Sequence, residues 1–370
     1  MNDAHPHTRS PVLEERVVTA AFAGASLAAH YIEGADAAVD PPPAVLREVC
    51  PVEDQDLDDS LADLGKVGAV KAPPVATRGF RGAISRLGFR VSPGIAEQEE
   101  LDLREQRARD EEIIRQATWV RAASILVANP KGGVGKTPTA LLLGGVLATV
   151  RGGSVCIVEV SDDAGALAYR AEGNPSLGLG ELVRDVDAIS TAGQLAGYTA
   201  PQTSYASVIG TVGRRPRLTD VDVRGVSEVV DRFYGIRVMD SGNQPSSAAF
   251  TGAVDTADAL VIPLYNAGDA ALEALALLDE LKAAGGHRAD LARRAIILRL
   301  SDGRPENSQV VARVDRIIAG SGVELVFTIP FDPHIAERGQ LTLSNLAAPT
   351  RSAFTAAAAG AIRALQTAVR

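Results

Sequence analysis

Cysteine is nearly absent from this chain of 370 residues, which contains only Cys50 and Cys156. Two thiols at that separation make neither a disulfide framework nor a metal cluster, and they are typical of a protein in a reducing compartment. Aromatic residues are also scarce, at 4%. Because apolar residues still make up 46% of the chain, we expect a core built mainly from Val, Leu, Ile and Ala.

Long apolar runs and a net positive charge are missing as well. No apolar run reaches the roughly 18–20 residues that span a bilayer, and the first residues have no apolar core of the kind found in signal peptides. The formal net charge of -9 at pH 7 excludes an overall basic field for nucleic acid, but it leaves a local basic patch open. We therefore expect a cytoplasmic protein.

Sequence patterns divide the chain into three parts. Residues 1–76 have no sustained periodicity, and their proline-rich and acidic stretches predict a mostly disordered tail. Residues 77–121 contain a basic amphipathic segment and then a stretch of mixed charge that predicts a helical linker. In residues 122–370, short apolar runs alternate with amphipathic helical stretches, which is typical of βαβ units.

The last part is thus predicted to be an α/β domain, with a mostly parallel twisted sheet flanked by helices. The expected strands are 124–128, 155–160, 207–212, 236–240, 259–264, 295–300 and 324–329. The expected helices are 136–150, 178–187, 219–233, 246–255, 269–284, 306–319 and 350–368.

Basic residues gather in two places. Within 78–91, helical spacing puts Phe80, Ile84, Leu87 and Val91 on one face, and the arginines beside that face are Arg78, Arg81, Arg86 and Arg90. Such a helix packs on its own domain or a partner protein, or it docks on a membrane surface or DNA; the sequence leaves these alternatives open. On the expected C-terminal helix, Arg351 and Arg363 either contact DNA or are solvated.

The most specific motif follows the first expected strand. It reads Lys131-Gly-Gly-Val-Gly-Lys136-Thr137, and an apolar helix comes next, which is the strand–loop–helix order that a P-loop requires. We expect Lys136 to reach the β- and γ-phosphates of a nucleotide and the Thr137 hydroxyl to bind Mg²⁺. Pro138 falls in the first helical turn, where its missing N–H costs little. Backbone N–H groups around the phosphates are expected from Gly132, Gly133, Val134 and Gly135.

Asp240 ends an apolar run at 236–239 and occupies a Walker B position. A carboxylate there holds a water molecule bound to Mg²⁺, and the stretch Ser241-Gly242-Asn243 would then sense the γ-phosphate. The alternative is an aspartate that only caps a turn at the strand end.

A second lysine at the start of the loop, in the form KGGxGK[ST], resembles the deviant Walker A motif of the ParA/MinD ATPases. The resemblance extends from about residue 124 to the C-terminus. Within the group the chain is most similar to actinobacterial MinD-like proteins, some of which accompany type VII (ESX) secretion systems. Besides the P-loop, the segments that carry the resemblance are 165–170, 232–236, 239–242 and 329–334.

This resemblance implies a P-loop ATPase with bound ATP and Mg²⁺ that forms a homodimer with ATP. It implies that Lys131 crosses the dimer interface to the partner's phosphates, as an arginine finger does, and that it lies unpaired in water in the monomer. The implied role is to position or partition a cargo such as DNA, a plasmid or secretion machinery, and a protein partner would stimulate the hydrolysis of ATP.

The second expected strand departs from the pattern V-D-x-D of the group. Glu159 matches the first acid, Ser161 stands where the second belongs, and Asp162 and Asp163 follow one or two residues later. Because a serine does not polarise water as a carboxylate does, we expect slow hydrolysis, with Asp162 or Asp163 as the candidate replacement. The alternative function is a hydrolysis-deficient, nucleotide-dependent scaffold of a secretion or conjugation system.

The base pocket departs from the group too, because no asparagine ends the strand 295–300. Two roles stay open for Arg299, which either stacks on the base or reaches solvent. Backbone contacts with adenine are expected from Pro330, Phe331 and Asp332. A metabolic P-loop kinase or synthetase is a further alternative, for which no second substrate motif is found.

Overall fold

The computed structural model describes residues 74–369, and residues 1–73 and 370 lie outside it. The predicted disordered tail at 1–76 therefore falls almost wholly outside the described residues. Among residues 74–369, no helix has the length and apolar character that a membrane crossing requires.

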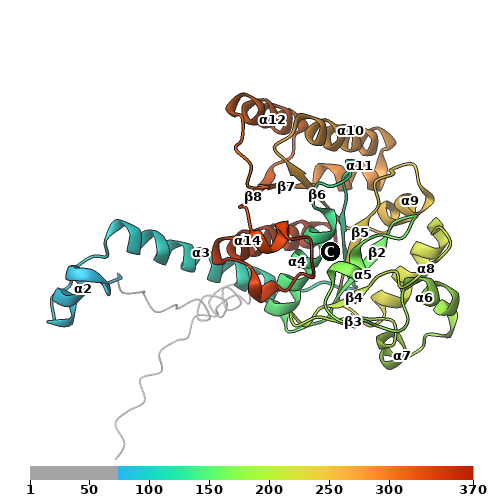
Figure 1. Cartoon of the computed structure of the whole chain (residues 1–370), viewed down its shortest axis with the longest axis horizontal. Coiled ribbons are helices and arrows are strands. Elements are labelled where there is room, and N and C mark those ends of the chain that lie inside the picture. Colours follow the sequence, from blue (N-terminus) through green and yellow to red (C-terminus); the bar gives the residue numbers. More distant parts are fainter. Residues whose placement is uncertain (1–73, 370) are drawn as a thin grey trace, which may run out of the picture. The chain divides into compact units, whose positions relative to one another are not determined.

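An eight-stranded sheet lies at the centre of the described chain, with the strand order β3-β4-β2-β5-β1-β6-β7-β8 (Figure 1). Every neighbouring pair is parallel except β3 and β4. The strands are β1 Ala123–Val127, β2 Val155–Val160, β3 Ala200–Pro201, β4 Ser207–Ile209, β5 Ile236–Ser241, β6 Ala259–Tyr265, β7 Ile296–Leu300 and β8 Leu325–Ile329. This confirms the predicted fold class, and β3 alone was not expected because two residues give no periodic pattern.

Helices cover both faces of the sheet (Figure 1). They are α2 Gly79–Arg86, α3 Ile95–Gln116, α4 Lys136–Arg151, α5 Leu167–Arg170, α6 Leu179–Asp185, α7 Ala192–Ala196, α8 Asp220–Asp231, α9 Ala248–Asp255, α10 Gly268–Ala284, α11 Gly286–Arg293, α12 Ser308–Ser321, α13 Pro333–Ala336 and α14 Ala348–Ala368, with short 3-10 turns at Val186–Ala188 and Leu343–Asn345. Residues of β1 are buried on both sides, which explains why this strand is a continuous apolar run.

The helix that follows the P-loop, α4, packs very closely on the sheet. Most of its residues are buried, and a Cβ atom added at Gly144 would lie only 2.6 Å from Cγ1 of Ile157 on β2. A side chain at Gly144 would therefore push the helix away from the strand. This close contact between α4 and β2 fixes the position of the N-terminus of α4 and of the loop between β1 and α4.

The basic segment at 78–91 is only partly helical. Helix α2 covers residues 79–86, and Gly88 takes a positive φ of 94° soon after it. Phe80 is 82% exposed and Leu87 is 77% exposed, so the apolar face does not pack on the α/β domain. A partner protein, a membrane surface and DNA remain the alternatives for this face.

Arg351 and Arg363 of the C-terminal helix both lie partly against the rest of the domain. Helix α3 packs against α14, and Arg363 lies 4.0 Å from the buried Asp110 of α3. The Nε atom of Arg351 is itself buried. The Arg363 side chain is nevertheless half-exposed, so contact with DNA and solvation both stay open for this helix.

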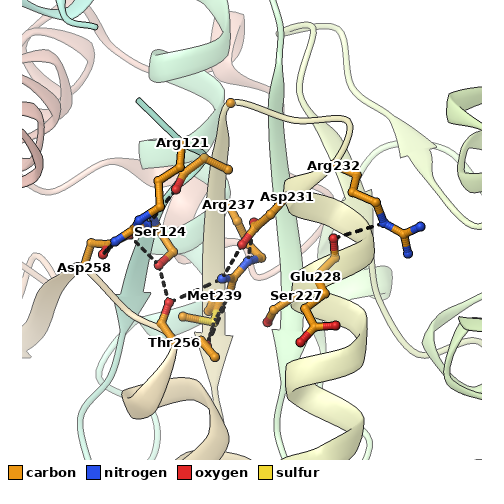
Figure 2. A network of polar contacts seen from close by, with 12 residues as sticks. Arg121, Ser124, Ser227, Glu228, Asp231, Arg232, Arg237, Met239, Thr256 and Asp258 are labelled. Atoms are coloured by element: carbon orange, nitrogen blue, oxygen red, sulfur yellow. Dashed lines mark hydrogen bonds and ion pairs between the residues drawn. The ribbon is translucent and has the colours of Figure 1, made fainter. Parts of the chain in front are cut away.

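A polar network joins the amino ends of β1 and β5, away from the P-loop (Figure 2). Arg121 donates to both carboxylate oxygens of Asp258, at 2.6 and 3.0 Å, and Asp258 also accepts from the backbone N–H of Ser124 at 2.9 Å. Beside them the buried Arg237 donates to Asp231 at 2.9 and 3.1 Å. Arg121 and Arg237 each have a carboxylate partner, which indicates a structural role for these two arginines.

Candidate functional site

A pocket of about 630 Å³ opens at the carboxyl ends of the central strands. The P-loop and the ends of β2 and β5 form one part of its wall, and the segments after β7 and β8 form the other. Carboxyl ends of parallel strands are the usual place for a ligand in this class of sheet.

The P-loop runs between β1 and α4 in the predicted order. Gly133 and Gly135 have positive φ values of 78° and 91°, which favour glycine. A Cβ atom at Gly135 would also lie 3.0 Å from Leu300. The loop residues that line the pocket are Gly133, Gly135, Lys136, Thr137 and Pro138.

Three loop residues lie elsewhere. Lys131, Gly132 and Val134 line a neighbouring cleft and not this pocket. Val134 is only 3% exposed and belongs to the apolar core, so its side chain anchors the loop.

Lys136 is buried at the centre of the loop. Its ammonium group donates to the backbone oxygens of Asn129 at 2.8 Å and Lys131 at 3.0 Å, and to the side-chain oxygen of Asn243. Burial lowers the pKa of Lys136 to about 8, although Asp240 acts in the opposite direction. A buried ammonium group held by three neutral oxygens favours an anionic ligand in front of it.

Asp240 faces the same pocket from the end of β5. Burial raises the pKa of Asp240 to about 7, and the Thr137 hydroxyl and the Lys136 ammonium oppose that shift. Its buried Oδ1 atom has no hydrogen-bond partner among the described residues. A carboxylate and a hydroxyl are oxygen ligands of the kind that Mg²⁺ prefers, so Asp240 and Thr137 fit the predicted metal, directly or through water.

The sequence predicts that Lys131 lies unpaired in the monomer, but the structure shows a partner for it. Its ammonium group lies 2.7 Å from a carboxylate oxygen of Asp269 at the start of α10, and both side chains are largely exposed. Asp269 raises the pKa of Lys131. The fold brings Asp269, which lies 138 positions further along the chain, next to Lys131. This ion pair directs Lys131 away from the pocket that holds Lys136.

A buried ion pair that the sequence did not indicate supports the loop after β2. Arg215 lies 2.9 Å from Glu159, and both side chains are only 1% exposed. The same guanidinium donates to the backbone oxygens of Ser161, Asp162 and Asp163 at 2.8, 2.8 and 3.1 Å. Arg215 thus holds three consecutive peptide groups in one conformation.

This loop presents Asp162 to the pocket. The Asp162 residue is 9% exposed, lines the pocket, and makes no side-chain hydrogen bond or ion pair within residues 74–369. A Cβ atom at Gly242 would lie 3.3 Å from its Oδ1 atom, so this carboxylate lies beside the stretch that follows Asp240. Ser161 instead donates to the backbone oxygen of Asp163 at 2.5 Å, and Asp163 pairs on the surface with Arg217.

The far end of the pocket is formed by Pro330, Phe331 and Asp332, together with Tyr265 and the stretch after β7. The Asp332 carboxylate accepts from the backbone N–H groups of His334 at 3.0 Å and Ala347 at 2.9 Å. Its side chain therefore shapes the loop, which leaves backbone groups and the partly exposed Phe331 ring to face the pocket.

The structure places Arg299 outside the lining of the pocket. Its guanidinium donates to Asn266 at 2.7 and 3.0 Å and to Asp315 at 2.6 Å, and it does not line the pocket. Successive side chains of a strand point to opposite faces, and Leu300 is the residue of this strand end that reaches the pocket. We therefore withdraw Arg299 from the base site.

Three other arginines line the far end of the pocket: Arg170, Arg304 and Arg338. Arg304 is 84% exposed at its side chain and pairs with Asp302 at 2.6 Å. The sequence assigned no role in the pocket to these residues, although Arg170 ends the segment 165–170 that resembles the group, because they come from three separate segments that only the fold brings together.

Comparison with known proteins agrees with this geometry. The family described as the CobQ/CobB/MinD/ParA nucleotide binding domain matches residues 125–342, which is more than half of the chain. The chain belongs to this family. The match includes the P-loop, Asp240 and the loop at Pro330, and the predicted relationship to the ParA/MinD group is thereby confirmed at the level of the domain.

Solved structures show the same fold. A ParA family ATPase from Chlorobium tepidum TLS has a TM-score of 0.54 at 16% identity, over 64% of this chain and 98% of that one. The MinD cell division protein of Aquifex aeolicus has a TM-score of 0.48 at 17% identity, over 64% of this chain and 95% of that one. No curated protein sequence matches the chain significantly.

Proposed function

We propose that this protein is a ParA/MinD-type ATPase that binds Mg²⁺-ATP in the 630 Å³ pocket, pairs into a homodimer with ATP, and positions or partitions a cargo. The observation that carries the proposal is the convergence of Lys136, Thr137 and the partnerless Oδ1 atom of Asp240 on one pocket. A metabolic kinase or synthetase is less well supported, because no second substrate motif accompanies these residues.

Lys136 binds the β- and γ-phosphates, whose charge the ammonium group offsets with charge-assisted hydrogen bonds. For that contact the side chain of Asn243 leaves Lys136, which makes Asn243 the residue that responds to the γ-phosphate. Thr137 and Asp240 hold Mg²⁺, which when bound neutralises charge that develops on the phosphates. The helix N-terminus of α4 adds its positive end to the same phosphates.

Hydrolysis depends on Asp162 in this proposal. Its carboxylate makes no hydrogen bond or ion pair among the described residues and lies beside Gly242 in the pocket wall, so it orients the attacking water in the place of Ser161. The loop has an altered register relative to the group, and we therefore expect slow turnover that a protein partner accelerates. A scaffold without hydrolysis is the second candidate, which Ser161 favours.

Dimerisation depends on Lys131. The lysine already points away from its own pocket and lies at an exposed loop edge, paired only with Asp269. Exposed ion pairs are weak because water and salt screen them, so the pair gives way when a second subunit presents its nucleotide. The apolar face of α2, with Phe80 and Leu87 exposed, is a surface for a partner or cargo. The finer expectation of a type VII secretion cargo rests on the sequence resemblance alone.

The experiment is a calorimetric titration of the full chain with Mg²⁺-ATP, alongside a phosphate-release assay. We expect wild type to bind and Lys136→Ala to lose at least about 100-fold in affinity, since charged hydrogen bonds of this kind contribute about 1.5–3 kcal/mol each. Equal affinity in both proteins would refute the site. Binding without any phosphate release, alone or with DNA or a candidate partner, would favour the scaffold.

A further inference from the structure

Arg170 is a buried cation without a counter-ion in the wall of the nucleotide pocket. The residue is 9% exposed, and its buried Nε atom has no hydrogen-bond partner among the described residues. Its guanidinium makes one long hydrogen bond, 3.4 Å to the backbone oxygen of Ile335, and forms no ion pair within residues 74–369. Burial lowers the pKa of Arg170, and the charge of Arg338 adds to this effect.

Arg215, in the same domain, is a buried arginine whose charge and N–H groups have partners. It has a carboxylate partner and three backbone oxygens, as described above. Burying a charge without such partners is costly. Residues kept in that state at the wall of a cavity are candidates for ligand contact, and for a guanidinium the matching ligand is a phosphate or carboxylate.

The surroundings of Arg170 place this charge next to the start of α4. Both Arg170 and Pro138 of the first turn of α4 line the pocket, and the charges of Arg170 and Arg338 both act on the Tyr265 hydroxyl. That hydroxyl lies 3.8 Å from the Cβ position of Gly135. Asp240, in contrast, is the charged group that acts on Lys136. Arg170 itself lies against α13, because its guanidinium donates to the backbone oxygen of Ile335, and Tyr265 and Ile335 line the same pocket.

Arg338 lies beside it, because the backbone N–H of Arg338 donates to the same Ile335 oxygen at 3.4 Å, and unlike Arg170 this residue is exposed. It takes a positive φ of 56°, an uncommon conformation for a residue with a side chain, and it forms no ion pair within the described residues. Two positive charges held near each other repel, and an anion between them would remove the repulsion.

We propose that Arg170 and Arg338 form a second phosphate-binding site in the nucleotide pocket, for a phosphate on the ribose side of the nucleotide. Two sources share this chemistry: the 5′-α-phosphate of an ordinary nucleotide, and a phosphate carried on a ribose hydroxyl. The inference rests on the proposed function in that its ligand is a nucleotide.

The test compares Mg²⁺-ADP with its 3′-phosphorylated and 2′-phosphorylated forms in calorimetric titrations of the full chain. If the site takes the α-phosphate, Arg170→Gln weakens all three ligands by at least about 10-fold. If it takes a ribose phosphate, one phosphorylated form binds wild type more tightly than ADP does, and Arg170→Gln removes that advantage. Arg304→Gln is the matched control, since that arginine lines the same pocket but is exposed and paired; its affinities should stay within about twofold.

A second measurement separates ligand binding from a structural role. Replacement of an unpaired buried charge relieves a cost, so Arg170→Met should raise the Tm of the ligand-free protein while lowering its nucleotide affinity. Undiminished binding of all three ligands by Arg170→Gln, or a lowered Tm for ligand-free Arg170→Met, would overturn the inference. A wild type that binds no Mg²⁺-ADP would instead overturn the proposed function itself.

Discussion

The two ends of the pocket are built in opposite ways. At the phosphate end, one short motif supplies Lys136 and Thr137, and the buried Lys136 is already held by backbone and side-chain oxygens. At the far end, Arg170, Tyr265 and Arg338 come from distant segments, and the buried Nε atom of Arg170 has no hydrogen-bond partner among the described residues. The first end is therefore formed by one local sequence motif, and the second by tertiary packing. At the second end, we propose that a ligand supplies the partner that Arg170 lacks.

The largest effect on stability should come from the ion pair that supports the phosphate end. Arg215→Ala leaves the Glu159 carboxylate buried and unpaired, which costs about 3–5 kcal/mol of folding free energy. Urea denaturation followed by circular dichroism measures it. The double variant Arg215→Met with Glu159→Leu is the control and should lose less than Arg215→Ala. A single variant as stable as wild type would contradict the paired state of Arg215, and with it the contrast to Arg170.

The P-loop is recognisable in the sequence for a physical reason. Glycines at 133 and 135, a lysine and a threonine must be adjacent to surround a phosphate, so the motif is readable without the fold. The strands were readable too, since those buried on both faces are continuous apolar runs. Their ends were less certain: β4 stops at Ile209, three residues before the expected end.

The remaining features depend on contacts between distant segments. Glu159 gave no sign of its buried partner Arg215, and Lys131 gave no sign of Asp269. Arg299 does not line the pocket and Leu300 does, because a shift of one residue along β7 exchanges the two faces of the sheet. Helix α11 was not expected, because Gly285 and Gly286 signal a chain break, whereas the chain continues directly into a new helix.

A smaller effect, on turnover alone, should come from the loop that Arg215 supports. Asp162→Asn keeps the shape of the side chain but removes the charge that orients water, so phosphate release should fall about 100-fold while the affinity for Mg²⁺-ATP changes little. Asp163→Asn is the matched control, because Asp163 is exposed and pairs with Arg217. Equal turnover in wild type and Asp162→Asn would remove Asp162 from the mechanism.

The smallest effect should come from the surface partner of Lys131. Asp269→Asn breaks an exposed ion pair, and such pairs are weak. The variant should dimerise with ATP about as well as wild type, or up to about threefold more tightly, as sedimentation velocity over a concentration series would measure. A complete loss of dimer in Asp269→Asn would mean that Asp269 belongs to the interface and does not merely hold Lys131 in the monomer.

The most direct measurement of the central claim is the mass of the particle in solution. Light scattering at tens of micromolar should give 38.5 kDa for wild type with ADP and twice that mass with ATP or a slowly hydrolysed analogue, while Lys131→Ala stays at the monomer mass under both conditions. A wild type that remains monomeric with ATP, or a Lys131→Ala protein that still doubles its mass, would contradict the account.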